Sequence, residues 1–531
     1  MRRYELLERI TWIGACLKEA GSTAAPATLQ DHSMQDIIAR NGLETPEPLK
    51  AEVKGSVPPW LQGTLVRNGP GLFSVGNSEY NHWFDGLSLI HSFTFHNGEV
   101  TYRSKYLKSE TYKSNTKADR IVVSEFGTMV YPDPCKNIFA RTMTHFRNIV
   151  PNFTDNNLIN IIRYGQDYYA SSEVNYINQI DPLTLETVGR VSLYTSKNHI
   201  ALNLATAHPH YDKDGNTFNM GTAIIGLGRP KYIIFKVPAN ASGMRVNIIV
   251  PFRSTLYPSY FHSFGMTENY IVFVEQPFKL DIVKLATAYF RGVNWGSCLK
   301  FDEKDSTFFH VINIKTGKAK SLRYHADALV VFHHINAYEE DDHVVFDIIA
   351  YKDSNLYDMF YLHNMTKETN NFIQTNKVFS PPVCQRFVLP LNVQKVQPGE
   401  AMRSIGSNEY GCSAGMELPG INYNFNARKY RYFYGSRLEW SPHPNKVDIV
   451  TKTHVEWRQE NCYPSEPVFV ASPGAEEEDD GVILSSVVSS DPSVSPFLLI
   501  LNAKTFEEVG RASIPVPVHI DLHGLFIPAK S

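Results

Sequence analysis

The sequence predicts an all-β protein, and the spacing of its apolar residues and of its turn residues both support that class. From about residue 49 onward, short alternating or apolar runs recur between turn signals such as His96-Asn97-Gly98. The chain is 43% hydrophobic and 12% aromatic, with 31 prolines and 32 glycines, which suits a large core crossed by many turns. Many short strands are typical of a barrel, a sandwich or a propeller. Such folds often remain one domain at a length of 531 residues.

Individual strands are expected where β-branched and aromatic residues cluster. They include residues 92–95, 168–170, 232–235, 270–274, 344–349 and 497–501. One phrase occurs twice, at Ile180–Arg190 and Ile500–Arg511, and predicts in both places a strand, a turn and a second strand. No regular repeat of roughly 40 to 50 residues is visible, so the pattern alone does not separate a propeller from other β folds.

Residues 1–47 differ from the rest of the chain and are predicted to form an N-terminal extension ahead of a β domain at 48–531. Arg2 and Arg3 among apolar residues suggest a targeting segment, but acidic residues such as Glu5 are unusual in one. The chain lacks a secretory core segment and any run of roughly 20 apolar residues. We therefore expect a protein that is not secreted.

One helix is expected over residues 278–295, where Ile282, Leu285, Ala286 and Val293 lie on one stripe. Two interpretations remain open for it. It is either a surface helix buried on one face, or a peripheral membrane contact that collects a lipid-soluble substrate.

The overall charge gives little support for a nucleic-acid partner. The formal charge is −3, and no basic run with interleaved aromatic residues is present. The six cysteines form no CxxC pair, which suits free thiols in a reducing compartment. The sequence carries no signal for an oligomeric state.

Four of the 19 histidines are set apart by their surroundings. They are His208 in Ala-Thr-Ala-His-Pro-His, His262 in Tyr-Phe-His-Ser-Phe-Gly, His333 in Val-Phe-His-His-Ile-Asn, and His523 in Asp-Leu-His-Gly-Leu-Phe. The gaps between them are too long for one helix or hairpin, and the local zinc motif HExxH is absent. Such spacing fits ligands donated by different strands around a central channel.

These four phrases, in this order, resemble the signature of the carotenoid cleavage oxygenases. Other matching phrases are Leu65–Gly71, Tyr80–Gly86, Ser124–Thr128 and Tyr463–Pro467, so the resemblance covers nearly the whole chain from about residue 48. It implies a seven-bladed β-propeller with a helical and loop cap over the active-site face, and four histidines on the propeller axis. It also implies one iron(II) per chain, dioxygen as co-substrate and oxidative cleavage of a carotenoid substrate.

The donor chemistry agrees with that resemblance. Imidazole suits iron(II), and four neutral ligands leave two octahedral positions open for dioxygen and its reaction partner. Imidazole also binds other divalent metals, so the residues alone do not select iron. The resemblance places a carboxylate behind three of the histidines: Glu173 behind His262, Glu417 behind His333, and Glu466 behind His523. Such carboxylates fix the ring tautomer.

Other residues near these phrases receive structural or substrate roles. Three further histidines are not expected to bind the metal: His210, His334 and His519. The motif His82–Asp85 is expected to pack an early blade. An apolar polyene needs an apolar tunnel, and the expected liners, by position relative to the family motifs, are Phe126, Trp295 and Tyr351. Ordinary core packing is the alternative for these aromatic residues.

Four phrases look most like the animal members that cleave carotenoids eccentrically: Gly55–Thr64, Glu275–Phe278, Ala286–Tyr289 and Glu477–Leu484. This resemblance implies cleavage of carotenes and xanthophylls at the 9′,10′ double bond to apo-10′-carotenals and ionone-type products, in the mitochondrion. Three alternatives stay open: central 15,15′ cleavage to retinal, a retinyl-ester isomerohydrolase that uses the metal as a Lewis acid, and a carotenoid-binding protein without turnover. The alternative location is cytoplasmic and membrane-associated.

Overall fold

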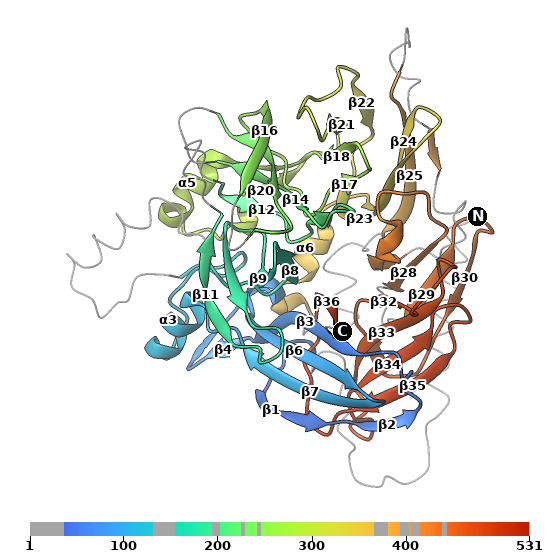
Figure 1. The fold of residues 1–531 in the computed structure, drawn as a ribbon. Helices are drawn as coiled ribbons and strands as arrows, with labels where there is room; N and C mark the ends of the chain where they lie inside the picture. The colour runs from blue at the N-terminus through green and yellow to red at the C-terminus, as the bar shows by residue number, and fades with distance from the viewer. Residues whose placement is uncertain are drawn as a thin grey trace, which may run out of the picture. The chain divides into compact units, whose positions relative to one another are not determined.

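Seven antiparallel β-sheets of four to six strands make up most of the described chain (Figure 1). The computed structural model describes residues 37–130, 154–193, 202–224, 229–241, 246–365, 381–392, 403–405, 415–437 and 443–529. Most sheets consist of strands that follow one another in sequence, which is the arrangement of propeller blades. The all-β class and the seven-bladed β-propeller are thereby confirmed. Residues 1–36 of the predicted extension lie outside the described residues, and its boundary at residue 47 stays a prediction.

The first four blades are built as follows. Blade 1 consists of β1 (Thr45–Lys50), β3 (Gly63–Leu72), β6 (Leu87–His96), β7 (Glu99–Tyr106) and β36 (His523–Pro528). Blade 2 consists of β8 (Asn160–Tyr164), β9 (Asp167–Ser171), β10 (Tyr176–Ile180) and β11 (Thr187–Ser192). Blade 3 consists of β12 (Leu204–Ala205), β13 (His210–Tyr211), β14 (Thr217–Ala223), β15 (Lys231–Val237) and β16 (Asn247–Ser254). Blade 4 consists of β17 (Gly265–Met266), β18 (Tyr270–Glu275), β21 (Thr307–Asn313) and β22 (Tyr324–Ala326).

The other three blades follow in sequence order. Blade 5 consists of β23 (Val330–Glu340), β24 (His343–Tyr351), β25 (Val383–Pro390) and β26 (Arg403–Ile405). Blade 6 consists of β27 (Met416–Gly420), β28 (Tyr432–Arg437), β29 (Pro444–Asp448) and β30 (Thr453–Glu456). Blade 7 consists of β2 (Glu52–Gly55), β31 (Cys462–Pro464), β32 (Val468–Ala471), β33 (Gly481–Ser489), β34 (Phe497–Asn502) and β35 (Glu508–Ser513). Two short pairs lie outside the blades: β4 (Ser74–Val75) with β5 (Ser78–Glu79), and β19 (Phe278–Leu280) with β20 (Leu299–Phe301).

Residue patterns distinguish strands that pack on two faces from strands that pack on one. In β34, every residue from Phe497 to Leu501 is buried, because neighbouring blades cover both faces of the sheet. In β7, buried Val100 and Tyr102 alternate with partly exposed residues, which is the period-2 pattern of a strand with one buried face. The cores therefore lie between adjacent blades.

The repeated phrase forms the same hairpin turn in blades 2 and 7. The Leu185 N–H donates to Asp181 O, and the Phe506 N–H donates to Asn502 O, both at 2.8 Å. Leu185 and Phe506 have φ values of 59° and 63°. The side-chain oxygen of Asp181 or Asn502 accepts from the N–H groups two and three residues further on, so the turn is an Asx type that fixes the hairpin register.

Strands from the two ends of the sequence close the propeller. In blade 1, β36 pairs with β3 and His523 faces Asn68. In blade 7, β2 pairs with β35 and Glu52 faces Ser513. Figure 1 shows these N-terminal strands in blue beside the C-terminal strands in red. Closure of this kind protects strand edges that would otherwise be unpaired.

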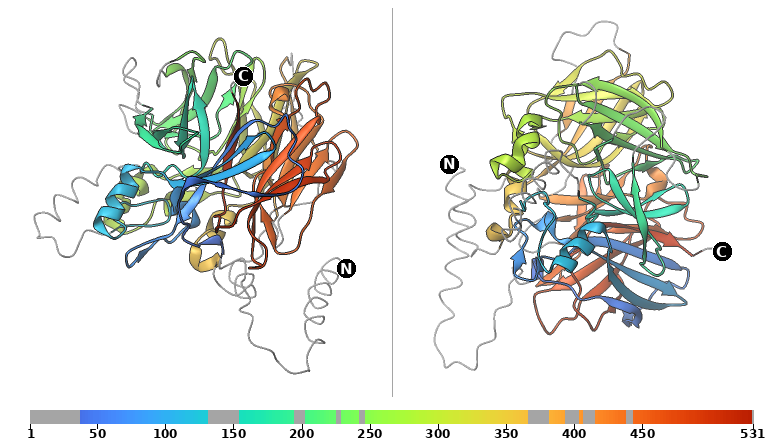
Figure 2. Two further views of the ribbon diagram at one scale, coloured as in Figure 1. Left: turned by 60° about the horizontal axis from the view of Figure 1, so that its bottom comes forward. Right: turned by 90° about the vertical axis from the view of Figure 1, so that its left-hand side faces the viewer.

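Short helices accompany the strands in the described part of the chain. They are α3 (Glu110–Ala118), α5 (Ile282–Arg291), α6 (Asn355–Met359), α7 (Leu362–Met365), η1 (Trp83–Asp85), η2 (Gly296–Cys298) and η4 (Tyr423–Phe425). Figure 2 shows α5 in green and α6 and α7 in gold on the same side of the sheets, and these three helices belong to the cap. The predicted helix over 278–295 is too long. Phe278 pairs with Phe301 in β19 and β20, so only Ile282–Arg291 is helical.

Candidate metal centre

Four histidines from four different blades meet near the propeller axis. His208 lies between β12 and β13, His262 precedes β17, and β23 and β36 carry His333 and His523. One ring nitrogen of each lies within 4.8 Å of those of the other three. The Nε2 atoms of His208 and His262 are 2.9 Å apart, and those of His333 and His523 are 3.3 Å apart. The sequence singled out this set, and the structure brings it together.

Three glutamates from the other three blades contact three of these rings. Glu173 follows β9, Glu417 lies on β27, and Glu466 lies between β31 and β32. The Nδ1–H of His262 donates to Glu173. The Nδ1–H of His333 donates to Glu417 at 2.5 Å, and that of His523 donates to Glu466 at 2.7 Å. Each of the seven blades therefore contributes one residue to the seven-residue cluster.

These hydrogen bonds determine what the inner nitrogens can bind. A neutral imidazole whose Nδ1 carries the proton has only a lone pair at Nε2. The Nε2 atoms of His333 and His523 therefore turn lone pairs toward one another at 3.3 Å, an arrangement that a cation between them would stabilise. Four such nitrogens are a donor set that suits iron, copper, nickel or zinc. The residues present fit a divalent metal ion.

Burial and neighbouring groups shift the pKa values of His208, Glu417 and Glu466. Burial, followed by His523, His262 and His333, lowers the pKa of His208 well below its usual value. Burial alone would raise the pKa of Glu417, but contacts with His333 and Tyr351 outweigh it and lower that pKa. The same balance, with His523 and Arg67 as partners, lowers the pKa of Glu466. Neutral imidazole and ionised carboxylate are the forms that metal binding requires.

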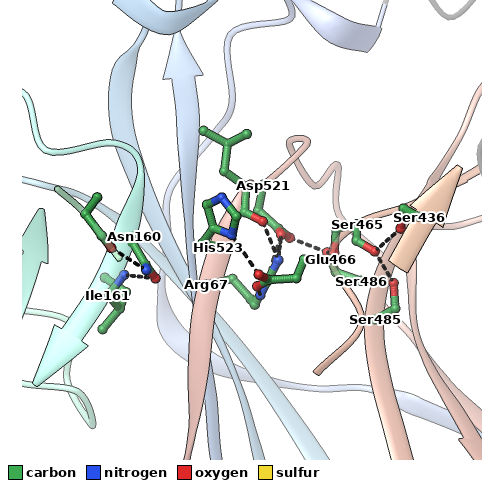
Figure 3. A network of polar contacts seen from close by, with 12 residues as sticks. Arg67, Asn160, Ile161, Ser436, Ser465, Glu466, Ser485, Ser486, Asp521 and His523 are labelled. Atoms are coloured by element: carbon green, nitrogen blue, oxygen red, sulfur yellow. Dashed lines mark hydrogen bonds and ion pairs between the residues drawn. The ribbon is translucent and has the colours of Figure 1, made fainter. Parts of the chain in front are cut away.

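Further residues support the glutamates, and sequence reasoning did not single them out in this role. The Tyr260 hydroxyl donates to Glu173 at 2.9 Å, and the Tyr351 hydroxyl donates to Glu417 at 2.6 Å. Arg67 donates to Glu466 at 2.6 Å (Figure 3). The available signal for Arg67 was a charged residue directly after the apolar pair Leu65 and Val66 in a segment expected to be buried. A buried arginine needs a partner.

The neighbouring histidines lie outside the metal cluster in the described part of the chain. His210 contacts Phe264 O at 2.8 Å, and His334 contacts the Ser263 hydroxyl at 2.9 Å. His519 packs against the ring of His91, with centroids 4.7 Å apart. These contacts agree with structural roles for the three histidines.

The motif His82–Asp85 forms η1 and holds the cap together. The His82 Nε2 contacts Tyr357 O at 2.9 Å, and burial lowers the pKa of His82 to about 4. Asp85 accepts from the Gly127 N–H at 3.0 Å and the Thr128 hydroxyl at 2.6 Å. The motif therefore joins α6 to the segment that follows α3, as expected for a packing element.

A cavity of about 350 Å³ lies against the histidine cluster. His262, His333 and His523 line one part of it. The rest of its lining is mainly aliphatic and aromatic and includes Phe84, Phe126, Trp295, Tyr351, Tyr357 and Phe360. All three predicted tunnel residues are thus in the wall, and Tyr351 also donates to Glu417. An apolar cavity beside a polar cluster is typical of a site for an apolar ligand.

The family model described as Retinal pigment epithelial membrane protein matches residues 38–528. The chain belongs to this family. Within it, the β,β-carotene 15,15′-dioxygenase of Gallus gallus is 54% identical over 523 residues, covering 93% of this chain and 98% of that protein. The Homo sapiens protein of the same name is 50% identical over 93% of this chain and 95% of its own length. The predicted family of carotenoid-cleaving oxygenases is confirmed.

A less similar relative and two solved structures also match the chain. The mitochondrial carotenoid-cleaving dioxygenase of Mustela putorius furo is 41% identical over 91% of this chain and 94% of its own. The Synechocystis apocarotenoid oxygenase variant Glu150Asp matches with a TM-score of 0.76 at 22% identity, over 94% of this chain and 98% of that one. A cobalt-substituted structure of the same oxygenase gives a TM-score of 0.75, also at 22% identity and the same coverage. These structures support the family fold.

The predicted 9′,10′ cleavage is wrong. Relatives at 50–54% identity are all named as 15,15′-dioxygenases, whereas the mitochondrial carotenoid-cleaving dioxygenases are 40–41% identical. The physical reason is that the four sequence phrases on which this prediction was based lie outside the described cavity wall. Among the residues of Gly55–Thr64, Glu275–Phe278, Ala286–Tyr289 and Glu477–Leu484 whose side chains the structure describes, none lines the cavity. The four phrases are therefore shared for reasons other than contact with the cavity, and they do not predict where a polyene would lie.

Proposed function

We propose that this chain is an iron(II)-dependent dioxygenase that cleaves the central 15,15′ double bond of β-carotene to give retinal. The observation that carries the proposal is the identity of 50–54%, over 93% of the chain, to relatives named as β,β-carotene 15,15′-dioxygenases. The four-histidine cluster beside an apolar cavity supports the same class of reaction.

The proposed iron site consists of four histidines held by three glutamates. The ligands would be the Nε2 atoms of His208, His262, His333 and His523. Bound iron(II) supplies the activation of dioxygen, which side chains alone do not provide. Glu173, Glu417 and Glu466 accept the Nδ1–H groups of His262, His333 and His523. They thereby hold three rings in the tautomer that leaves Nε2 free.

The cavity wall would select the reacting double bond. A polyene is rigid and apolar, so its position depends on shape and dispersion contacts along the wall. Phe126, Trp295 and Tyr351 lie in that wall, and we propose that they align the substrate. The same apolar wall would keep water from the reacting carbons.

Product analysis tests the reaction. Purified, iron-loaded protein is incubated with β-carotene in detergent under ¹⁸O-labelled dioxygen, and the products are identified by mass spectrometry. We expect labelled retinal and no apo-10′-carotenal. Labelled apo-10′-carotenals would contradict the central position, and iron retention without any cleavage would contradict the dioxygenase assignment. His262→Ala, which removes one proposed ligand, is the negative control and should give no labelled product.

We also propose that α5 and the adjacent loop are the peripheral membrane contact. Val283 on α5 is 63% exposed, and Leu256 and Tyr257 are 56% and 54% exposed. The loop adjoins α5 because the Leu280 N–H donates to Pro258 O at 2.9 Å. Leu280 and Leu285 line the cavity, so this surface lies beside a path for an apolar substrate. Among the described residues, no helix combines the length and apolar character needed to cross a bilayer.

Vesicle binding tests that contact. Val283→Glu should reduce co-sedimentation with phosphatidylcholine vesicles, because it replaces an exposed apolar side chain of α5 with a charged one. Leu183→Glu is the matched control, since Leu183 is 67% exposed in the turn between β10 and β11. Equal binding of the two variants would contradict the assignment.

The mitochondrial location stays a prediction. Relatives at 40–41% identity carry that location in their names, while the names at 50–54% identity state none. Fractionation of cells that express the chain with and without residues 1–36 would test it. Loss of a mitochondrial signal on deletion is the result that the prediction requires.

A further inference from the structure

Arg67 is a buried cation directly behind one of the proposed ligands. Its side chain is completely buried on β3. The Arg67 Nη1 donates to Glu466 at 2.6 Å, while Nε and Nη2 donate to Asp521 Oδ1 at 2.8 and 2.6 Å. Figure 3 shows the guanidinium between these two carboxylates and a dashed line that joins His523 to Glu466. One rigid group thus fixes both acids.

The three supporting glutamates differ in what holds them. Tyr260 and Tyr351, both neutral donors that line the cavity, hold Glu173 and Glu417. Of the three glutamates, Glu466 is the one that makes an ion pair with an arginine within the described part of the chain. A guanidinium has fixed, planar donor geometry, so its position determines the position of the carboxylate more strictly than a rotatable hydroxyl does.

The environment of Arg67 is itself fixed on several sides. Asp521 accepts from His91 Nε2 at 2.9 Å and from the Ser486 hydroxyl. The Arg67 Nη2 also donates to Leu522 O at 2.9 Å. Arg67 pairs with Gly524 in the ladder between β3 and β36, one residue from His523. The guanidinium therefore ties blade 7, which carries Glu466, to the closing strands of blade 1.

We propose that Arg67 is a positioning residue for the metal centre: it holds Glu466 in place and thereby orients the ring of His523. This inference rests on the proposed metal site and is independent of which double bond is cleaved. Arg67 does not touch the metal position, so its effect reaches the metal through Glu466 and His523. A structural role alone would affect folding stability and leave metal binding unchanged.

Cobalt(II) binding separates the two roles. The full chain and Arg67→Lys are stripped of metal and titrated with cobalt(II), and the visible absorption bands and the Kd are recorded. Lysine keeps the charge and loses the planar fork. We expect a shift of the bands and a Kd raised about tenfold, as is typical for loss of an outer partner of a metal ligand.

The matched control is Arg386→Lys. Arg386 makes a two-point ion pair with Asp347 at 2.8 Å from Nε and from Nη2, and Asp347 is fully buried. This pair joins β24 and β25; neither residue belongs to the histidine cluster or lines the cavity. We expect a lower unfolding temperature for both variants and altered cobalt binding only for Arg67→Lys.

Two outcomes would overturn the proposal. The first is wild-type cobalt bands and Kd in folded Arg67→Lys. If Arg67→Lys does not fold, Asp521→Asn is tested instead, because it keeps Arg67 and weakens the contact that holds its guanidinium. An unchanged cobalt Kd in Asp521→Asn overturns the proposal, and a raised Kd supports it. Failure of the unaltered chain to bind cobalt(II) would instead refute the metal site on which the proposal rests.

Discussion

The two ends of the cavity are built on different principles. At the polar end, His333 and Glu417 illustrate directional contacts: the His333 Nδ1–H donates to one oxygen of Glu417 and the Tyr351 hydroxyl donates to the other. At the apolar end, Tyr357 contacts several rings at once, including Phe332 at 4.9 Å and Phe278 at 5.0 Å between centroids. Directional contacts fail when one atom is lost, whereas shared dispersion contacts degrade gradually. Substitutions at the polar end should therefore weaken metal binding, and substitutions at the apolar end should change rate and product selection while the metal stays bound.

The largest effect is expected for a proposed ligand. His262→Ala removes one of four nitrogen donors and leaves Glu173 without its ring partner. We expect loss of bound metal and of turnover together, measured by metal analysis and product formation on the same sample. Full activity with iron retained would show that His262 is not a ligand. It would also contradict the assignment of metal binding to the polar end of the cavity.

A smaller effect is expected one step from the ligands. Glu417→Gln keeps the shape of the side chain and removes the charge that faces His333, so metal affinity should fall about 10- to 100-fold. Glu275→Gln is the control, because Glu275 accepts from His310 at 2.7 Å in a pair outside the described metal cluster. Equal metal loss from the two variants would mean that the effect is general destabilisation.

At the apolar end, Phe126→Ala should weaken selection without removing metal. Phe126 lines the cavity and packs against Tyr357 at 6.0 Å between ring centroids. Loss of the ring widens the cavity, so we expect kcat/KM to fall about tenfold, equivalent to about 1.4 kcal/mol, with minor off-centre products. Phe526→Ala, in a core outside the cavity, should change neither kcat/KM nor the products. Metal loss in Phe126→Ala would contradict the division into two ends.

The smallest effect concerns His82, which packs against the cavity residues Phe84 and Phe126. Burial lowers its pKa from 6.5 to about 4, so as pH falls below 6.5 the unfolded chain takes up a proton first and is stabilised. His82 therefore contributes stability above that pH and loses it on acidification. Between about pH 7.5 and pH 5, the stability gap between wild type and His82→Gln should shrink by about 2 kcal/mol. Chemical denaturation at the two pH values measures this gap, and a constant gap would contradict the assignment.

Strands were the most predictable part of the fold, because their signal is local. The run Phe497–Leu501 predicted a strand, and these residues lie in β34. The helix over 278–295 was predicted too long, because the competing pairing of β19 with β20 joins Phe278 to Phe301. That pairing involves Phe301, which lies outside the window 278–295. The spacing of apolar residues within the window therefore does not reveal it.

In the candidate site, the histidines and glutamates that lie within distinctive sequence phrases could be predicted. The residues that hold the glutamates in place could not. The four histidines and three glutamates do lie together, although their metal-binding role stays a prediction. Arg67 was missed because its partners Glu466 and Asp521 are about 400 residues away or more. The cleaved bond was predicted wrongly because it depends on the cavity wall, which residues from Ile38 to His523 form together.

The position of β36 has a consequence for the timing of maturation. A ribosome releases residue 523 only after nearly all of the propeller has been made, and His523 completes the set of four histidines while β36 completes the ladder with β3. A nascent chain that ends before this strand has neither a sealed ring nor a full ligand set. The proposed metal site is therefore complete only after synthesis has passed this strand.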